Sequence, residues 1–332
     1  MIVRDEEENL RANLPLWNDV ASCYVFGVDD RTADGTVQAI REALPAKKPR
    51  FVFFYTFEDF SQARNAVLRS TSHNFPGVSH VLIADADWRP QQETLDLSDL
   101  DFDHGVFQFR IWDHSGHTTR LAGWLLRNDP GLMFKYSNAP SKLIKWQVAV
   151  VESDSSWHAT EHGHSRTAER FLFDMDLLEL DYKDDPTDLH NLFYLGITTY
   201  SYMETLIGKG THEKTPELQR LIDSGMSYFL QAVDLYGDQE GLEFIWSSIR
   251  WLAYGYHYFV GDDAEAERWY RKCIDYDVTR IDCEVFLSRL YLDTGDLDNA
   301  WERAKVGLLY NYPMHRPLDY FYIFECFVPI QV

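Results

Sequence analysis

Hydrophobic positions follow two different patterns along the chain, and the change comes after the segment Lys183-Asp184-Asp185-Pro186. Before it, short continuous apolar runs alternate with segments in which apolar residues recur at helical spacing. Continuous apolar runs are typical of parallel strands that are buried on both faces, and the segments between them predict the covering helices. The pattern predicts strands at residues 24–28, 51–55, 80–84, 106–111 and 147–151, and helices at 6–20, 35–44 and 61–69. The first half is therefore expected to be an α/β domain with a mostly parallel sheet.

The second half is helical in pattern and contains an internal repeat. Residues of the same kind recur at an offset of 34: Gly261 and Gly295, Asp262 and Asp296, Ala266 and Ala300, Tyr276 and Tyr310, and Leu252 and Phe286. A period of this length is typical of tetratricopeptide repeats, in which each repeat is a helix–turn–helix unit. Two ordinary helical hairpins with a coincidental offset are the alternative. We expect the α/β domain at residues 1–178 and an all-α, tetratricopeptide-like domain at residues 179–332.

Charge adds a constraint on partners. The chain has 332 residues and a formal net charge of −22, from 31 basic and 53 acidic residues. A charge of this sign repels phosphate backbones, so we expect no nucleic-acid partner. It also repels nucleotides unless a cation or nearby arginines intervene, so a nucleotide site in this chain has extra need of a metal ion.

The four cysteines, Cys23, Cys273, Cys283 and Cys326, show no C-x-x-C spacing. We interpret them as free thiols in a reducing compartment. The acidic segment at residues 5–8 predicts no signal peptide, and no apolar run reaches the length of a membrane span. The expectation is a cytoplasmic protein.

The segment Asp85-Ala86-Asp87 follows the apolar run at 81–84, which belongs to the third predicted strand. Ligands of open α/β sheets bind at the carboxyl ends of the strands. Mg²⁺ and Mn²⁺ prefer oxygen ligands, and they are often held by one or two carboxylates together with substrate phosphates. Two acids at this place therefore suggest a metal–diphosphate site, with a solvated strand end as the alternative.

Other strand ends also carry residues that suit a nucleotide. Asp29 can accept hydrogen bonds from a ribose or a base, whereas Asp34 is better explained as a helix cap. Arg64 lies one turn into the helix after the next strand and can bind phosphate oxygens with both arms of its guanidinium. A surface arginine is the alternative. Asp59 or Ser61 is the expected N-cap of that helix.

Together these segments resemble family 2 glycosyltransferases with the nucleotide-sugar-binding GT-A fold. Residues 1–7, 29–36, 57–65, 84–87 and 125–128 resemble that family's opening strand and its D-x-G-S-x-D-G-T, W-x-D-D-F-S-x-A-R-N, D-x-D and L-F-R-N segments. Residues 171–195 are similar to the junction with tetratricopeptide repeats in a known subgroup. The resemblance covers nearly the whole chain and implies a GT-A-like, mostly parallel sheet covered by helices, followed by helical repeats.

The resemblance also implies roles for individual residues. Asp29 would contact the uracil or ribose of a UDP-sugar, and Arg64 would lie near the nucleotide. Asp85 would face the ribose and the metal, and Asp87 would coordinate Mn²⁺ or Mg²⁺. A later histidine often completes such a metal site, and His162 is our choice from a polar cluster at residues 158–164. An exposed polar loop is the alternative for that cluster.

The sequence departs from the family where many members carry a His-Glu pair after a P-G-x-x-F stretch. Residues 130–134 keep that stretch, but residues 137–142 supply no such pair. Asp113 and His114, beyond the predicted strand at 106–111, are then the candidate general bases, with ordinary loop residues as the alternative. Trp88 can stack on a sugar or base, or it can pack in the core.

The sequence therefore predicts metal-dependent transfer of a sugar from a UDP-sugar to an acceptor peptide, protein or glycan, with inversion of the anomeric carbon as in relatives. The helical half is expected to bind the acceptor, to form a homodimer or to cover the site. A scaffold without catalytic activity, which binds partners through its helical repeats, is the alternative that the missing His-Glu pair favours. A nucleotidyltransferase is a third possibility, disfavoured because no Gly-rich N-terminal loop precedes a basic residue.

Overall fold

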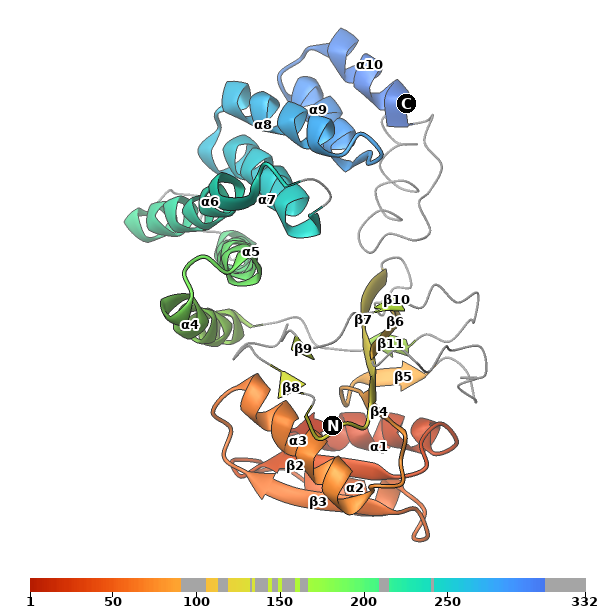
Figure 1. Cartoon of the computed structure of the whole chain (residues 1–332). Coiled ribbons are helices and arrows are strands. Elements are labelled where there is room, and N and C mark those ends of the chain that lie inside the picture. Colours follow the sequence, from red (N-terminus) through yellow and green to blue (C-terminus); the bar gives the residue numbers. More distant parts are fainter. Residues whose placement is uncertain are drawn as a thin grey trace. The chain divides into compact units, whose positions relative to one another are not determined.

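The chain folds into two compact units, which join in sequence between His164 and Ser165. The structure, a computed structural model, describes residues 1–90, 106–112, 119–131, 133–134, 143–144, 149–150, 159–161, 167–208, 215–239 and 242–307 (Figure 1). The predicted boundary at residues 178–179 falls inside α4 (Ala168–Asp184), the first helix of the second unit.

A three-stranded parallel sheet begins the first unit. Its strands are β1 (Ile2–Val3), β2 (Tyr24–Asp29) and β3 (Arg50–Tyr55), in the order β1-β2-β3. The helices of this part are α1 (Glu7–Asn13), the short 3₁₀-helix η1 (Leu14–Trp17), α2 (Thr36–Ala43) and α3 (Phe60–Asn74). β2 is buried along its whole length, as its continuous apolar run predicts. The strands predicted at 24–28 and 51–55 are thus confirmed.

The remaining strands form a mixed sheet and a separate pair. The six-stranded sheet contains β4 (His80–Ile83), β5 (Trp88–Pro90), β6 (Val106–Trp112), β7 (Thr119–Arg127), β10 (Ala149–Val150) and β11 (Ala159–Glu161), and the pair is β8 (Met133–Phe134) with β9 (Leu143–Ile144). The order is β4-β7-β6-β11-β5, with β10 beside β6. β7 runs antiparallel to both β4 and β6. The single, mostly parallel GT-A-like sheet that we predicted is therefore not found in the described residues.

Two local features explain where these predictions fail. Only residues 113–118 separate β6 from β7, too few for the crossover that a parallel pair needs, so the pair is antiparallel. The helix predicted at residues 6–20 ends at Asn13, and the chain continues as η1 with Pro15 near its start. Proline suits the first turn of a helix but not the interior, so a new short helix begins there.

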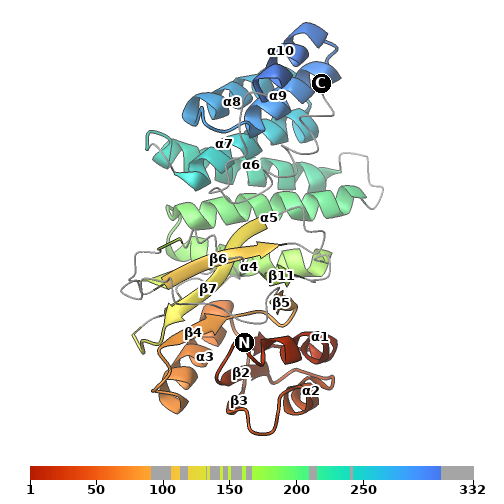
Figure 2. The same ribbon diagram turned by 90° about the vertical axis from the view of Figure 1, so that its right-hand side faces the viewer.

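The described part of the second unit is helical throughout. After α4 come α5 (Leu189–Gly208), α6 (Pro216–Tyr236), α7 (Glu243–Tyr254), α8 (Asp263–Tyr276), α9 (Asp282–Asp293) and α10 (Leu297–Gly307), stacked in chain order (Figure 2). A π-helix, η2 (Gly255–Val260), continues α7. The helices pair as the hairpins α5/α6, α7/α8 and α9/α10. The predicted all-α, tetratricopeptide-like half is therefore confirmed as a series of helical hairpins.

The 34-residue repeat corresponds to the turns inside two hairpins. Gly261 precedes α8 with φ 78°, and Gly295 precedes α10 with φ 81°. Only glycine adopts this left-handed conformation at little cost, so both residues end the first helix of a hairpin. The following aspartates cap the second helix, because Asp262 accepts a hydrogen bond from the Glu265 N–H at 3.1 Å and Asp296 accepts one from Asn299 at 3.2 Å. Tyr310, the last repeat position, lies outside the described residues.

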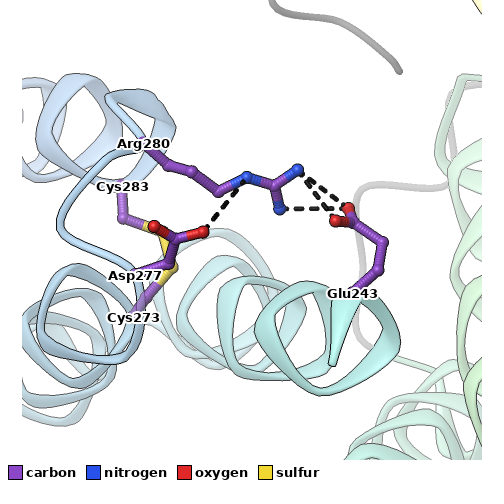
Figure 3. The surroundings of a disulfide bond; sticks show 5 residues. All are labelled: Glu243, Cys273, Asp277, Arg280 and Cys283. Carbon is purple, nitrogen blue, oxygen red and sulfur yellow. Dashed lines mark hydrogen bonds and ion pairs between the residues drawn. A yellow bond between two sulfur atoms is a disulfide. The ribbon is translucent and has the colours of Figure 1, made fainter. Parts of the chain in front are cut away.

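A disulfide joins α8 to α9, between Cys273 and Cys283 (Figure 3). The prediction of free thiols is wrong for this pair. The two residues are 10 apart in sequence, and the reversal between α8 and α9 brings their Cα atoms to 6.2 Å. Cys23 is a half-buried free thiol. Since disulfides are rare in reducing compartments, the cysteines no longer argue for a cytoplasmic location.

Beside the disulfide, an ion pair links two successive hairpins. Arg280 lies between α8 and α9, and its side chain is 1% exposed. Its guanidinium donates to Glu243 at the start of α7 at 3.0 Å, and it lies 3.7 Å from the ring centre of Trp246 (Figure 3). The charge is therefore buried with both a carboxylate and an aromatic face beside it. Among the described residues, no helix is long and apolar enough to cross a lipid bilayer.

Candidate functional site

Asp29 ends β2, and its carboxylate is buried as an ion pair. The side chain is 2% exposed, and both oxygens accept hydrogen bonds from Arg31, from Nε at 2.9 Å and from Nη2 at 2.6 Å. These bonds hold the pKa of Asp29 below its usual value, although burial alone acts in the opposite direction. The Arg31 side chain is 48% exposed, so one side of this ion pair remains open to an anionic ligand.

The turn after β2 is fixed to the start of α1. Asp34 accepts hydrogen bonds from the Thr36 N–H at 2.9 Å and from the Glu7 N–H at 2.9 Å. The carboxylate of Glu7 in turn accepts a bond from Gly35 at 3.0 Å. Burial raises the pKa of Asp34, but these hydrogen bonds outweigh it and lower that pKa. Asp34 therefore fixes the turn before α2, but the N-cap of α2 is Gly35 without a side-chain cap, so the predicted capping role of Asp34 is not confirmed.

Asp85 and Asp87 lie on either side of a buried residue. Both acids are half-buried, whereas Ala84, Ala86 and Trp88 are buried in the core. The core side is fixed by hydrogen bonds to the backbone, because Asn13 donates to the Ala86 carbonyl at 2.8 Å and Trp17 donates to the Trp88 carbonyl at 3.1 Å. The alternation of burial places the two carboxylates apart from the core. This segment is thus fixed to α1 and η1 from its core side, and both of its acids are half-buried.

Two arginines lie near the ends of the neighbouring strands. Arg64, in the second turn of α3, lies 5.6 Å from the ring centre of Phe60 and 5.4 Å from that of Phe134. Its charge and that of Arg31 both act on the Tyr55 hydroxyl at the end of β3, while burial raises the pKa of Tyr55 to about 12. Burial also lowers the pKa of the Met1 amine, which Asp85 raises and Arg64 lowers. The ends of β2, β3 and β4 and the start of α3 therefore converge.

Three residues of this region were missed by sequence reasoning. Arg31 binds Asp29, Arg4 acts on the pKa of the same carboxylate from the end of β1, and Asn13 fixes the segment around Ala86. An arginine two residues after a strand-end acid is a usable signal for Arg31. Asn13 is 1% exposed in an amphipathic helix. The only sequence signal for its role was that this polar residue lies on the apolar side of that helix.

Some predicted site residues lie elsewhere. Trp88 is 4% exposed within the core cluster around Leu10, Leu14 and Trp17, and this favours the core interpretation. Asp59 caps α3 by accepting from Gln62 at 2.7 Å, as predicted. Asp113, His114 and His162 lie outside the described residues, and their proposed roles stay predictions.

The residues present fit a divalent cation in part. Two carboxylates from one short, fixed segment can hold Mg²⁺ or Mn²⁺ when phosphate oxygens complete the ligand set. Among the described residues, no group of three His, Cys, Asp or Glu side chains could hold a metal ion. The ligand set would then depend on the nucleotide itself.

A second candidate site lies on the helical unit, on the first helices of its three hairpins. Half-buried aromatic side chains run across α5, α7 and α9; we name them the aromatic row, and they are Phe193, Tyr194, Phe244, Trp251, Tyr254 and Phe286. Phe244, Trp251 and Tyr254 share one side of α7, because they are seven and ten residues apart. Phe193 stacks on Phe244 with ring centres 5.0 Å apart, and Tyr254 meets Phe286 at 6.3 Å.

A cation lies within the aromatic row. The guanidinium of Arg250 lies 4.6 Å from the ring centre of Trp251 and 5.9 Å from that of Phe286. The Tyr254 hydroxyl donates to Glu204 of α5 at 3.1 Å, and burial raises the pKa of Tyr254. Aromatic residues and arginine are the side chains most enriched at protein interfaces. The aromatic row thus has the composition of a binding surface.

The comparisons with known proteins identify no family for this chain. No protein-family model matches the sequence, and no curated protein is similar to it. Among solved structures, the chain is similar to the crystal structure of MamA, with 16% identity, TM-score 0.24 and coverage of 43% of this chain and 93% of that one. It is also similar to TTC0263, a thermophilic TPR protein in Thermus thermophilus, with 16% identity, TM-score 0.27 and coverage of 42% and 82%. At such TM-scores these likenesses carry no weight, and the helical repeats rest on the hairpins and glycines described above.

Proposed function

We propose that the protein is a helical-repeat scaffold that binds an extended polypeptide partner through the aromatic row. The observation that carries this proposal is the continuity of half-buried aromatic side chains over α5, α7 and α9. Stacked helix pairs present the same helix of each pair on one extended surface. A ligand that crosses several repeats therefore meets one ring after another, with Arg250 among them.

The chemistry of the aromatic row indicates what kind of segment it binds. Large, rigid rings provide contact area at low cost in side-chain entropy, and they favour apolar or aromatic side chains on the partner. The guanidinium of Arg250 adds a cation beside these rings, which favours a backbone carbonyl or a carboxylate at that place. We expect an extended peptide with alternating apolar and polar residues.

The experiment selects binding peptides from a random display library against the full chain and measures their Kd by calorimetry. Trp251→Ala with Phe286→Ala should weaken binding by at least about 10-fold, since truncated aromatic anchors cost the most at interfaces. Trp301→Ala is the matched control, because this exposed tryptophan lies on α10, outside the aromatic row. Equal loss in the control, or no loss in the double variant, would count against the proposal.

We further propose that the converging strand ends of the first unit bind a UDP-sugar with Mn²⁺ or Mg²⁺ and support glycosyl transfer. The specific observation in favour is that Asp85 and Arg64 both act on the Met1 amine, and that Arg31 and Arg64 both act on the Tyr55 hydroxyl near Asp29. In a chain with net charge −22, a cation and local arginines are what an anionic donor requires. A bound cation would neutralise charge on the diphosphate leaving group.

A measurement of UDP binding distinguishes this second function from a scaffold role alone. Calorimetry with UDP should show binding that depends on Mn²⁺ and that Asp87→Asn weakens by at least about 10-fold. The control is Asp19→Asn, because Asp19 is exposed and lies in the loop after η1. Binding of UDP that is the same without Mn²⁺, or in both variants, would contradict the assignment. Where binding holds, a hydrolysis screen of nucleotide sugars identifies the donor.

A further inference from the structure

Arg250 lies in the aromatic row without an acidic partner. Its guanidinium lies 4.6 Å from the ring centre of Trp251 and 5.9 Å from that of Phe286. The ring centre of Trp246 is 5.7 Å away on another side. The Nε atom of Arg250 is buried and has no hydrogen-bond partner, whereas the side chain as a whole is half-buried. No carboxylate of the described residues forms an ion pair with this permanent charge.

The other arginines in the described helical unit have partners. Arg220 on α6 donates to a carbonyl of its own helix. On the first helices of the hairpins, α5 has no lysine or arginine, α7 has Arg250 alone and α9 has Arg289 alone. The arginines that pair with carboxylates are Arg170, Arg268, Arg271, Arg280, Arg289 and Arg303. Within this part of the chain, Arg250 is therefore the arginine that an external anion can neutralise.

A guanidinium held among rings favours an ionised carboxylate as its ligand. Charge-assisted hydrogen bonds are about twice as strong as neutral ones, and arginine offers two parallel N–H groups to one carboxylate. The rings exclude water on their side and restrict the motion of the side chain, so less entropy is lost on binding. A backbone carbonyl would accept a hydrogen bond but would leave the charge uncompensated. A carboxylate is therefore the better match for Arg250.

A neighbouring acid limits how much negative charge this place accepts. Glu204 on α5 accepts a hydrogen bond from Tyr254 at 3.1 Å, and the Tyr254 ring meets Phe286 at 6.3 Å. The charge of Arg250 reaches the same hydroxyl, because burial raises the pKa of Tyr254 and Arg250 lowers it. A phosphate with nearly two charges, or a run of acids, would be repelled by Glu204 and by a chain of net charge −22. One carboxylate among apolar residues is matched by one guanidinium.

We propose that Arg250 selects the partner by binding the carboxylate of a single Asp or Glu side chain within the extended segment. This inference rests on the proposed peptide-binding function of the aromatic row. The acid lies beside Arg250 and Phe286, and the apolar residues that flank it contact the rings on either side. The rings then supply most of the affinity, while the ion pair fixes the register of the peptide along the row.

The test is a double-mutant cycle on the full chain with a peptide selected from the display library. Calorimetry gives Kd for the unchanged protein and for Arg250→Met, each with the selected peptide and with a peptide whose acid is replaced by its amide. Either change should weaken binding roughly 10-fold, and both together should weaken it no more than one alone. Methionine keeps an unbranched stem against the rings, and an unchanged Tm checks the fold. Arg220→Met on α6 is the matched control and should leave every Kd unchanged.

The outcomes separate this inference from the proposed function. If Trp251→Ala with Phe286→Ala weakens binding, but the selected peptides share no acid or the two changes of the cycle multiply, the row binds peptides and the role of Arg250 is overturned. If no peptide binds, both are overturned. C-terminally amidated peptides should bind equally well, and a loss on amidation would contradict recognition of a side chain. Tighter binding when phosphoserine replaces the acid would likewise contradict a site for one carboxylate.

Discussion

The two units are built from different kinds of interactions. In the first unit, buried polar side chains such as Asn13 and Asp29 bind backbone carbonyls or charges close to the strand ends. In the second unit, aromatic rings pack with aliphatic and small residues in the core; Phe229 is 0% exposed, and a Cβ on Gly196 would lie 2.5 Å from its ring. The second unit also buries a charged side chain, Arg280, which pairs with Glu243, and it differs from the first unit in repeating one kind of helical hairpin. We therefore assign the proposed UDP-sugar site to the first unit and the proposed peptide-binding surface to the second.

The largest effect is expected in the aromatic core of the second unit. Phe229→Ala should lower the free energy of unfolding of that unit by about 3–5 kcal/mol, because the truncation leaves a cavity among packed rings. Urea unfolding monitored by circular dichroism measures it. Leu235→Ala on the same helix is the control, since Leu235 is 46% exposed and should cost less than about 0.5 kcal/mol. A similar cost for both would show that the core is not packed as described.

The disulfide gives the next effect and again concerns the second unit alone. Replacing Cys273 and Cys283 with alanine should cost about 2.7 kcal/mol, because the bridge closes a loop of 10 residues in the unfolded chain. Thermal unfolding of the oxidised protein and the double variant measures it. Cys23→Ala is the control, since this thiol is free. Three reactive thiols from Cys23, Cys273 and Cys283 in the unfolded, unreduced protein would contradict the bridge.

A polar substitution should affect the first unit in a similar range. Asn13→Ala should cost about 1–3 kcal/mol, because the Ala86 carbonyl and the Arg89 guanidinium lose a buried partner. It should also weaken Mn²⁺-dependent UDP binding, since Asp85 and Asp87 would no longer be held. Asn74→Ala is the matched control, because its bond to Ser70 is exposed. Urea unfolding and calorimetry check both statements; loss of stability without loss of binding would separate Asn13 from the site.

The smallest effect concerns pH and distinguishes the two units. Burial lowers the pKa of His257 from 6.5, despite Asp293 at 3.4 Å, so the second unit should lose stability as the pH falls below 6.5. Asp29 has a pKa held below 3.8, so its contribution is present above that pH and is lost only as the pH falls further. In urea unfolding measured across pH, His257→Gln should reduce the loss of stability of the second unit below pH 6.5. Asp29→Asn should reduce the loss of stability of the first unit at lower pH. Loss of stability of both units over the same pH range would contradict the assignment.

The sequence predicted individual helices, strands and turns better than the pairing between distant segments. The strand at residues 24–28 and the hairpin turns at Gly261 and Gly295 follow from apolar continuity and from the conformational freedom of glycine, which are local properties. The pairing of β4 with β7 depends on residues far apart, and an apolar strand looks the same in a parallel or a mixed sheet. For the same reason the Cys273–Cys283 bridge was missed, because its spacing matters only after α8 and α9 reverse direction.

The candidate site shows the same limit at the level of side chains. Asp85 and Asp87 could be located from the end of a strand, but the role of Asp34 was predicted only in part, because it fixes the turn while Gly35 is the N-cap of α2. The burial of Trp88 could not be predicted, because a tryptophan after a strand suits a ligand as well as a core. The bidentate bond from Arg31 to Asp29 depends on the turn between them, which the sequence does not specify.

The division of tasks between the units is tested most directly by hydrogen exchange of the full chain with and without a selected peptide. The account predicts slower exchange in α5, α7 and α9, and unchanged exchange in β2, β4 and α3. Protection confined to the first unit, or spread over the second helices α6, α8 and α10 instead, would contradict it.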